Sequence, residues 1–242
     1  MFNQNRTMPV YNTESLSVEK SNSILRLVYL WMGLGLLTTS LVAVLVANTP
    51  SLLEIAISPA MPLISMVFLI GISIALSVGI TRNWLKPSGA IALFFVYSAV
   101  MGFVLSVVVV YAAFDPRAVY SAAGTSAALF GAMTFVGFTT KMDLSRFGFF
   151  FMAALIGIMI ATLINFFLKS SAFDFIISVF GVLLFTGLTA YDTQRIKTMA
   201  ANPAIQADGS LSVKISIIGA LHLYLDLINL FLFLLRIFAS RD

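Results

Sequence analysis

The chain has 242 residues, of which 60% are hydrophobic and only 10% are charged. A soluble domain carries about 25% charged residues, so this composition excludes a soluble protein and indicates a membrane protein with several spans. The formal net charge of +4 does not indicate nucleic-acid binding, because the basic residues stand singly at the ends of apolar runs and form no phosphate-binding stripe.

Seven apolar runs follow one another along the chain, and each is long enough to cross a membrane, which takes about 20 residues. In chain order the expected spans are residues 24–47, 61–80, 90–113, 119–139, 147–168, 173–191 and 215–238. Proline and polar residues separate them, and no connection is long enough to form a further domain. We therefore predict an all-α polytopic membrane protein, with a polar cytoplasmic segment at 1–23 and a single seven-helix bundle at 24–242.

The basic residues predict the orientation, because lysine and arginine concentrate in cytoplasmic loops. The side of the amino terminus carries ten of them: Arg6, Lys20, Arg26, Arg82, Lys86, Lys141, Arg146, Arg195, Lys197 and Lys214. The opposite side carries only four: Arg117, Lys169, Arg236 and Arg241. This bias predicts a cytoplasmic amino terminus. Seven full spans place the carboxyl terminus outside, whereas a re-entrant last segment would return it to the cytoplasm.

Two aspartates lie within apolar runs. Asp192 closes the sixth run, and Asp226 lies in the middle of the seventh. A carboxylate inside the bilayer costs at least about 2.5–3.5 kcal/mol, so such a group normally faces a bundle interior and marks a functional site. Asp192 lies about 7–8 Å of helix rise from Lys197, and Asp226 lies about 18 Å beyond Lys214. The two acids can therefore meet only if the sixth helix continues into residues 198–200 or the seventh begins outside the membrane.

One face of the seventh span is polar along most of its length. At about 100° per residue, four side chains fall within about 80° of one another, namely His222, Asp226, Asn229 and Arg236. Such a helix is expected at the centre of the bundle, with Asp226 in a functional role. Asn229 is as compatible with packing as with function, and Arg236 can extend to the lipid headgroups. His222 lies four residues before Asp226, so it either modulates this acid or donates a hydrogen bond to a neighbouring carbonyl.

The sequence gives no support for cofactor chemistry. The chain lacks cysteine, which excludes disulfides, thiolate catalysis and cysteine-bound metal centres. Its single histidine cannot build a histidine metal cage. No phosphate-binding loop of the Gly-x-x-x-x-Gly-Lys-Ser/Thr type occurs, so an ATP-driven pump is not indicated. We expect no cofactor.

Two segments around the aspartates resemble the transmembrane Bax inhibitor motif family. They are GLTAYDTQRIK at residues 187–197 and LYLDLINLFLFLLR at 223–236, supported by TTKMDLS at 139–145. The resemblance covers almost the whole chain after the polar segment and points to the bacterial branch, which implies a bacterial cytoplasmic (inner) membrane. It also implies a seven-helix fold with a central last helix.

The same resemblance implies a pH-sensitive calcium leak that a pair of carboxylates gates, here Asp192 and Asp226. Two carboxylates within hydrogen-bond reach share a proton and titrate together. With one proton they form a closed latch, and without it they repel, separate and present oxygen ligands to a passing calcium ion. The expected partners are membrane lipids and calcium. Some relatives pair these acids with an arginine at the end of the second helix; Arg82 is the candidate, although it suits a headgroup anchor equally well.

Other functions compete with a channel. Some relatives carry a glutamate in the second helix, which residues 61–80 lack, and a non-conducting regulator that binds and modulates a membrane protease is the main alternative. A protonatable pair also suits a proton-coupled transporter. Aspartyl intramembrane proteases likewise place a Tyr-Asp and a second acid on two helices. Their second acid follows Gly-x-Gly, however, whereas Asp226 follows Leu-Tyr-Leu, so we expect no enzymatic activity.

Overall fold

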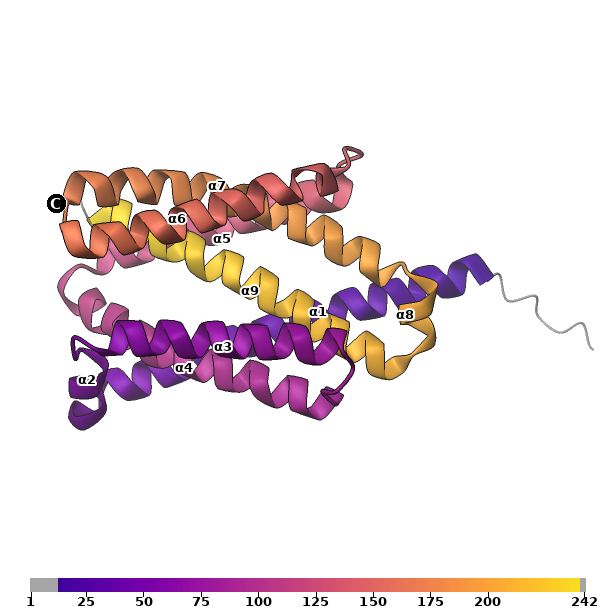
Figure 1. The fold of residues 1–242 in the computed structure, drawn as a ribbon, viewed down its shortest axis with the longest axis horizontal. Coiled ribbons are helices and arrows are strands. Elements are labelled where there is room, and N and C mark those ends of the chain that lie inside the picture. The colour runs from indigo at the N-terminus through magenta and orange to yellow at the C-terminus, as the bar shows by residue number, and fades with distance from the viewer. Residues whose placement is uncertain (1–12, 240–242) are drawn as a thin grey trace, which may run out of the picture.

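The computed structural model describes residues 13–239, which form helices joined by short turns and contain no strand (Figure 1). Seven of the helices are long and apolar enough to cross a membrane, which confirms the predicted all-α polytopic membrane protein. In chain order the elements are α1 Thr13–Ala47, α2 Pro50–Ala56, α3 Met61–Thr81, α4 Pro87–Phe114, α5 Pro116–Thr139, the 3-10 helix η1 Leu144–Phe147, α6 Gly148–Leu168, α7 Ser171–Ala200, α8 Pro203–Ala207 and α9 Gly209–Ala239.

The helix boundaries follow from local sequence signals. Pro87 and Pro116 each occupy a first helical position, where the missing N–H costs nothing. Asp115 caps α5 by accepting a hydrogen bond of 3.0 Å from the Ala118 backbone N–H. The sharp turn between α6 and α7 places Lys169 in the left-handed region at φ 52°, and the Ser170 hydroxyl caps α7. These signals mark where the long helices begin and end.

Helix α9 lies at the centre of the bundle. Figure 1 shows it crossing between α5, α6 and α7 on one side and α3 and α4 on the other. It packs against α1, α3, α4, α5 and α7, and buried side chains occur along its whole length from Lys214 to Leu235. The structure confirms the predicted central last helix. Helix α6 is the opposite case, because it packs mainly against α7 and has no buried residue.

A buried polar contact fixes α9 to α1. The hydroxyls of Tyr224 and Thr39 lie 2.7 Å apart, and Thr39 Oγ1 also lies 2.9 Å from the carbonyl of Ser98 on α4. Tyr224 is fully buried, with its ring edge-to-face against Phe94 and Tyr97 at centroid distances of 6.1 and 6.0 Å. Aromatic packing with a satisfied hydroxyl stabilises the three-helix junction.

Two long helices extend beyond the apolar runs. Helix α7 continues to Ala200, past the predicted end at 191, and α9 begins at Gly209, six residues before the predicted start. The first condition under which the two aspartates can meet, continuation of α7 into residues 198–200, is therefore present, and α9 begins before its apolar run. Helix α1 likewise begins at Thr13, so that residues 13–23 of the polar segment add about three turns to it. Arg6 and Arg241, which contribute to the predicted orientation, lie outside the described residues.

Candidate functional site

Glycines set the register between α7 and α9. A Cβ at Gly181 would lie 2.6 Å from the Phe233 ring, and a Cβ at Gly219 would lie 3.2 Å from the side chain of Ile196. The two contacts define an antiparallel pair in which Asp192 of α7 lies level with His222 of α9. Asp226 lies about one turn further along α9, away from the α7–α9 connection. The helix extensions thus bring together the residues that the sequence places at different depths.

Asp192 and His222 face each other across the two helices. His222 Nδ1 lies 3.8 Å from Asp192 Oδ1, which is an ion-pair distance and too long for a hydrogen bond. The nearest acid to His222 is thus on α7, and not Asp226 on its own helix face. Arg195, one turn along α7, adds a positive charge that acts on both groups.

Asp226 lies deeper than this pair. It is 3% exposed, against 8% for Asp192, and the charge of Asp192 acts on it. Its Oδ2 atom is buried without a hydrogen-bond partner, as is His222 Nδ1. Buried polar atoms are usually paired, so two unpaired atoms on neighbouring ionisable groups indicate a site that is kept for function.

Three further hydroxyls form a cluster, one of them on the residue that follows Asp192. The oxygens of Tyr29 on α1, Thr134 on α5 and Thr193 on α7 lie near one another, and all three are buried without a hydrogen bond of good geometry. Gly137 of α5 packs directly on α7, since a Cβ there would lie 2.5 Å from the Ala190 carbonyl and 2.8 Å from Thr193 Cβ. The acid site is therefore enclosed by α1, α5, α7 and α9.

The sequence analysis did not identify these hydroxyls, because isolated Thr and Tyr residues in an apolar run resemble ordinary packing positions. For Thr193 a signal was available, since it directly follows Asp192.

The remaining candidate residues lie elsewhere. The Asn229 side-chain amide donates to the Leu225 carbonyl of its own helix at 2.8 Å. Arg236 pairs with Asp174 at 3.5 Å near the opposite end of α7, instead of simply extending to the headgroups. Arg82 is exposed at the end of α3 and forms no ion pair with any residue of the described range 13–239. In this conformation, the positive charge that acts on Asp192 alongside His222 comes from Arg195.

Polar contacts attach the α5–α6 loop to the segment of α7 that follows the acid. The Gln194 side chain accepts from the Leu144 N–H and donates to the Met142 carbonyl, both at 2.8 Å. Lys197 Nζ donates to the Phe138 carbonyl at 2.7 Å. In the same loop, hydrogen bonds from Ser145 lower the pKa of the exposed Asp143 carboxyl, which caps η1. These contacts hold α7 in place directly after Thr193.

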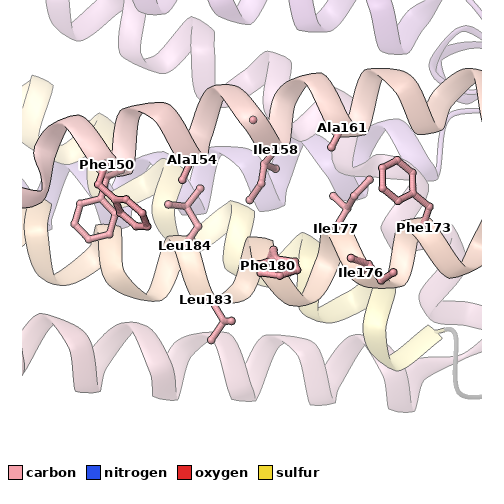
Figure 2. A pocket seen from close by; sticks show the side chains of 12 residues that line it. Phe150, Ala154, Ile158, Ala161, Phe173, Ile176, Ile177, Phe180, Leu183 and Leu184 are labelled. Carbon is pink, nitrogen blue, oxygen red and sulfur yellow. The ribbon is translucent and has the colours of Figure 1, made fainter.

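One cavity lies away from the acid site. It is a groove of about 560 Å³ between α6 and α7, and Figure 2 shows aromatic and aliphatic side chains from both helices along it. Phe150 and Ala154 of α6 and Phe173 and Phe180 of α7 are among its lining residues. Without a charged or hydrogen-bonding side chain in its lining, the groove suits contact with apolar groups and offers no ion a ligand.

Comparison with known proteins places the chain in a defined group. The family described as inhibitor of apoptosis-promoting Bax1 (Bax1-I) matches residues 21–242. Over 220 residues the chain is 44% identical to the inner membrane protein YbhL of Escherichia coli strain K12, with 88% of this chain and 90% of YbhL covered. It is 40% identical to an uncharacterized protein of Deinococcus radiodurans, covering 95% and 96% of the two chains. An uncharacterized protein of Borreliella burgdorferi is 35% identical, with 91% and 93% covered.

Proposed function

Because the chain belongs to the family of inhibitors of apoptosis-promoting Bax1, we propose that it is a pH-sensitive leak channel for calcium, without enzymatic activity, which Asp192 and Asp226 gate. The observation that carries the proposal is the position of the two acids. Both are buried on neighbouring helices in the middle of a membrane bundle, and their charges interact. An acid that served packing alone would be fully paired, whereas Asp226 Oδ2 has no partner.

Proton sharing supplies the gate. When the pair holds one proton, a single hydrogen-bonded unit can join α7 to α9 and keep the bundle closed. When the proton leaves, two negative charges in a medium of low dielectric constant repel each other, which favours separation of the two helices. When His222 is protonated it favours the ionised acids, because its Nδ1 lies 3.8 Å from Asp192 Oδ1. Flux is therefore expected to rise with pH.

The ligand set suits passage of calcium more than storage. Calcium in a stable protein site takes about six to eight oxygen ligands. Within residues 13–239 no group of three or more His, Asp or Glu side chains could hold a metal ion. In the open state a calcium ion would thus meet the Asp192 and Asp226 carboxylates and complete its shell with water. Such a site binds the ion weakly and releases it readily.

One observation favours a second candidate function, a non-conducting regulator that binds a membrane protease. Helix α6 stands at the edge of the bundle with no buried residue, and exposed side chains such as Phe150 and Phe180 line the apolar groove between it and α7 (Figure 2). A transmembrane helix of a partner could pack there through close van der Waals contact. This function requires the groove and does not require a pair of titrating acids.

Calcium flux into liposomes, measured between pH 5 and pH 8, tests the channel. We expect wild-type flux to rise with pH, and Asp192→Asn and Asp226→Asn each to remove that dependence. The double variant should resemble either single one, because members of a unit are not additive. Asp174→Asn is the matched control, since it changes a carboxylate of the same helix near its opposite end. Additive effects, or wild-type pH dependence in either single variant, would exclude the pair as the gate, and absence of flux in every protein would favour the regulator.

We extend the inner-membrane location that YbhL carries in its name to this chain, with the amino terminus in the cytoplasm. The ten-to-four distribution of basic residues supports this orientation. Because the chain has no cysteine, single cysteines report topology cleanly. A cysteine replacing Ser170 should react with an external impermeant reagent, and one replacing Lys86 should not. The reverse pattern would invert the topology, and a protected cysteine at position 240, outside the described residues, would show a re-entrant last helix.

A further inference from the structure

We propose that the hydroxyls of Tyr29, Thr134 and Thr193 form a hydrated relay through which protons reach Asp192 from the end of the bundle where α7 ends and α9 begins. The inference rests on the proposed titration of Asp192 and Asp226. That titration requires a route by which protons travel between the solution and the acids. A carboxyl that is 8% exposed responds to the pH of the solution only if a path of polar groups connects the two.

The outer part of the route is a vestibule of about 330 Å³ between α1, α5, α7 and α8. Five of its nine lining residues have polar side chains, among them Ser21, Asn22, Lys197 and Gln206, although apolar atoms make up most of its surface. Its volume has room for several water molecules, each of which takes about 30 Å³ in the liquid. Solvent can therefore enter the bundle at this end.

One aromatic ring lines the inner wall of the vestibule, and a second ring packs against it. Phe138 lines it, and the Phe138 ring packs on that of Tyr29 with centroids 6.3 Å apart. On α1, Tyr29 lies one turn beyond Leu25, another lining residue, and hence on the same face of the helix. The Tyr29 hydroxyl extends past this wall and lies near Thr134 and Thr193. Tyr29 thus has its ring beside the vestibule and its oxygen in the interior.

The orientation of Thr193 is unlike that of its neighbours. A threonine in a helix commonly donates to the carbonyl four residues earlier, and Thr186, Thr189 and Thr198 of α7 all do so, at 2.6, 2.7 and 3.0 Å. The hydroxyl of Thr193, which is 1% exposed, makes no such bond. On α5, Thr139 bonds its own helix in the same way, while Thr134 does not. Thr125 of α5 also lacks this bond, and of the three threonines without it Thr134 and Thr193 are the ones that lie beside the Tyr29 hydroxyl.

The charges around the route favour protons over metal cations. Lys197 stands at the vestibule, where the lining residues of α1 flank Glu19, and Arg195 and His222 act on Asp192. Positive charges oppose the approach of calcium. A proton can instead be passed between neutral hydroxyls and water, because each hydroxyl both donates and accepts. No bond other than O–H is formed or broken in the relay.

Cysteine reactivity tests whether water reaches the relay. Full-length Thr193→Cys in liposomes, exposed to a small neutral methanethiosulfonate, should be modified in spite of its burial, with the mass increase as the readout. The matched control is Ser216→Cys on α9, since Ser216 is equally buried and its hydroxyl bonds the Val213 carbonyl at 2.7 Å. We expect at least a tenfold difference in rate. Equal rates would overturn the proposal, because both positions would then be equally dry.

A pH jump followed by infrared absorption of the protonated carboxyl tests the transfer itself. Tyr29→Phe and Thr193→Val should slow the protonation several-fold without moving its midpoint, and Thr193→Ser, which keeps the hydroxyl, should retain the wild-type rate. Unchanged rates in the first two variants would refute the relay. Neither assay measures flux, so a protein that shows both effects and conducts no calcium would keep the relay and lose the proposed channel.

Discussion

Replacement of Gly137 by alanine should weaken the bundle at the acid site. The new Cβ would lie 2.5 Å from the Ala190 carbonyl oxygen and 2.8 Å from Thr193 Cβ. Restoring an ordinary contact of 3.4 Å requires α5 and α7 to move apart locally by about 0.9 Å. Neither neighbour can yield, because one is backbone and the other is the Cβ of a buried residue. Forced expansion of a packed interior costs about 1–3 kcal/mol, which is the expected loss in the free energy of unfolding.

Gly131 and Gly124 on the same helix provide the control. A Cβ at either position has open space within 4 Å, so alanine there should leave stability unchanged or raise it by up to about 1 kcal/mol through helix propensity. The measurement is unfolding of the purified protein in mixed detergent micelles, followed by circular dichroism. Equal midpoints for Gly137→Ala and Gly131→Ala would refute the close α5–α7 contact. A destabilised Gly137→Ala should also show an altered pH response, because the displaced segment flanks Asp192.

Three further outcomes follow from the contacts. His222→Ser removes a group that, when protonated, favours the ionised form of Asp192 from 3.8 Å away. Without it the acids should keep their proton to higher pH, so the midpoint of calcium flux against pH should move to higher pH. An unchanged midpoint would assign His222 to packing. Tyr224→Phe removes the 2.7 Å contact with Thr39 and should lower the free energy of unfolding in detergent by about 0.6–1.5 kcal/mol, a loss that would be absent if the two hydroxyls did not bond. Arg82→Gln should leave both stability and the pH response at wild-type values, and a shifted flux midpoint would show that Arg82 reaches the acids in another state.

Hydrophobicity accounts for the part of the fold that the sequence predicts well. Each span is a run of about 20 apolar residues, and the stripe that contains His222 and Asp226 marks the last helix as central before any contact is known. The condition for a meeting of Asp192 and Asp226 also follows from helix rise alone. The seven-helix architecture therefore follows from patterns within single segments.

Relations between helices could not be predicted in this way. The opposition of Asp192 and His222 depends on the register of α7 against α9, which the contacts at Gly181 and Gly219 set. Spacing along one helix suggested Asp226 as the neighbour of His222, and tertiary packing places Asp192 closer. Tyr29 lies more than a hundred residues before Thr134, and nothing local in either segment indicates that their hydroxyls are close.

The burial of α9 has a consequence for how the protein is made. This helix follows all the other described helices in the chain, so the ribosome completes it after the helices that surround it. Until α9 inserts, the faces of α1, α5 and α7 that pack against it have no partner, although α1 already contacts α4 and α5 already contacts α7. Native packing is thus completed in one late step. A nascent chain that stops before Gly209 lacks its centre, and its Thr39 hydroxyl lacks the Tyr224 hydroxyl that α9 provides.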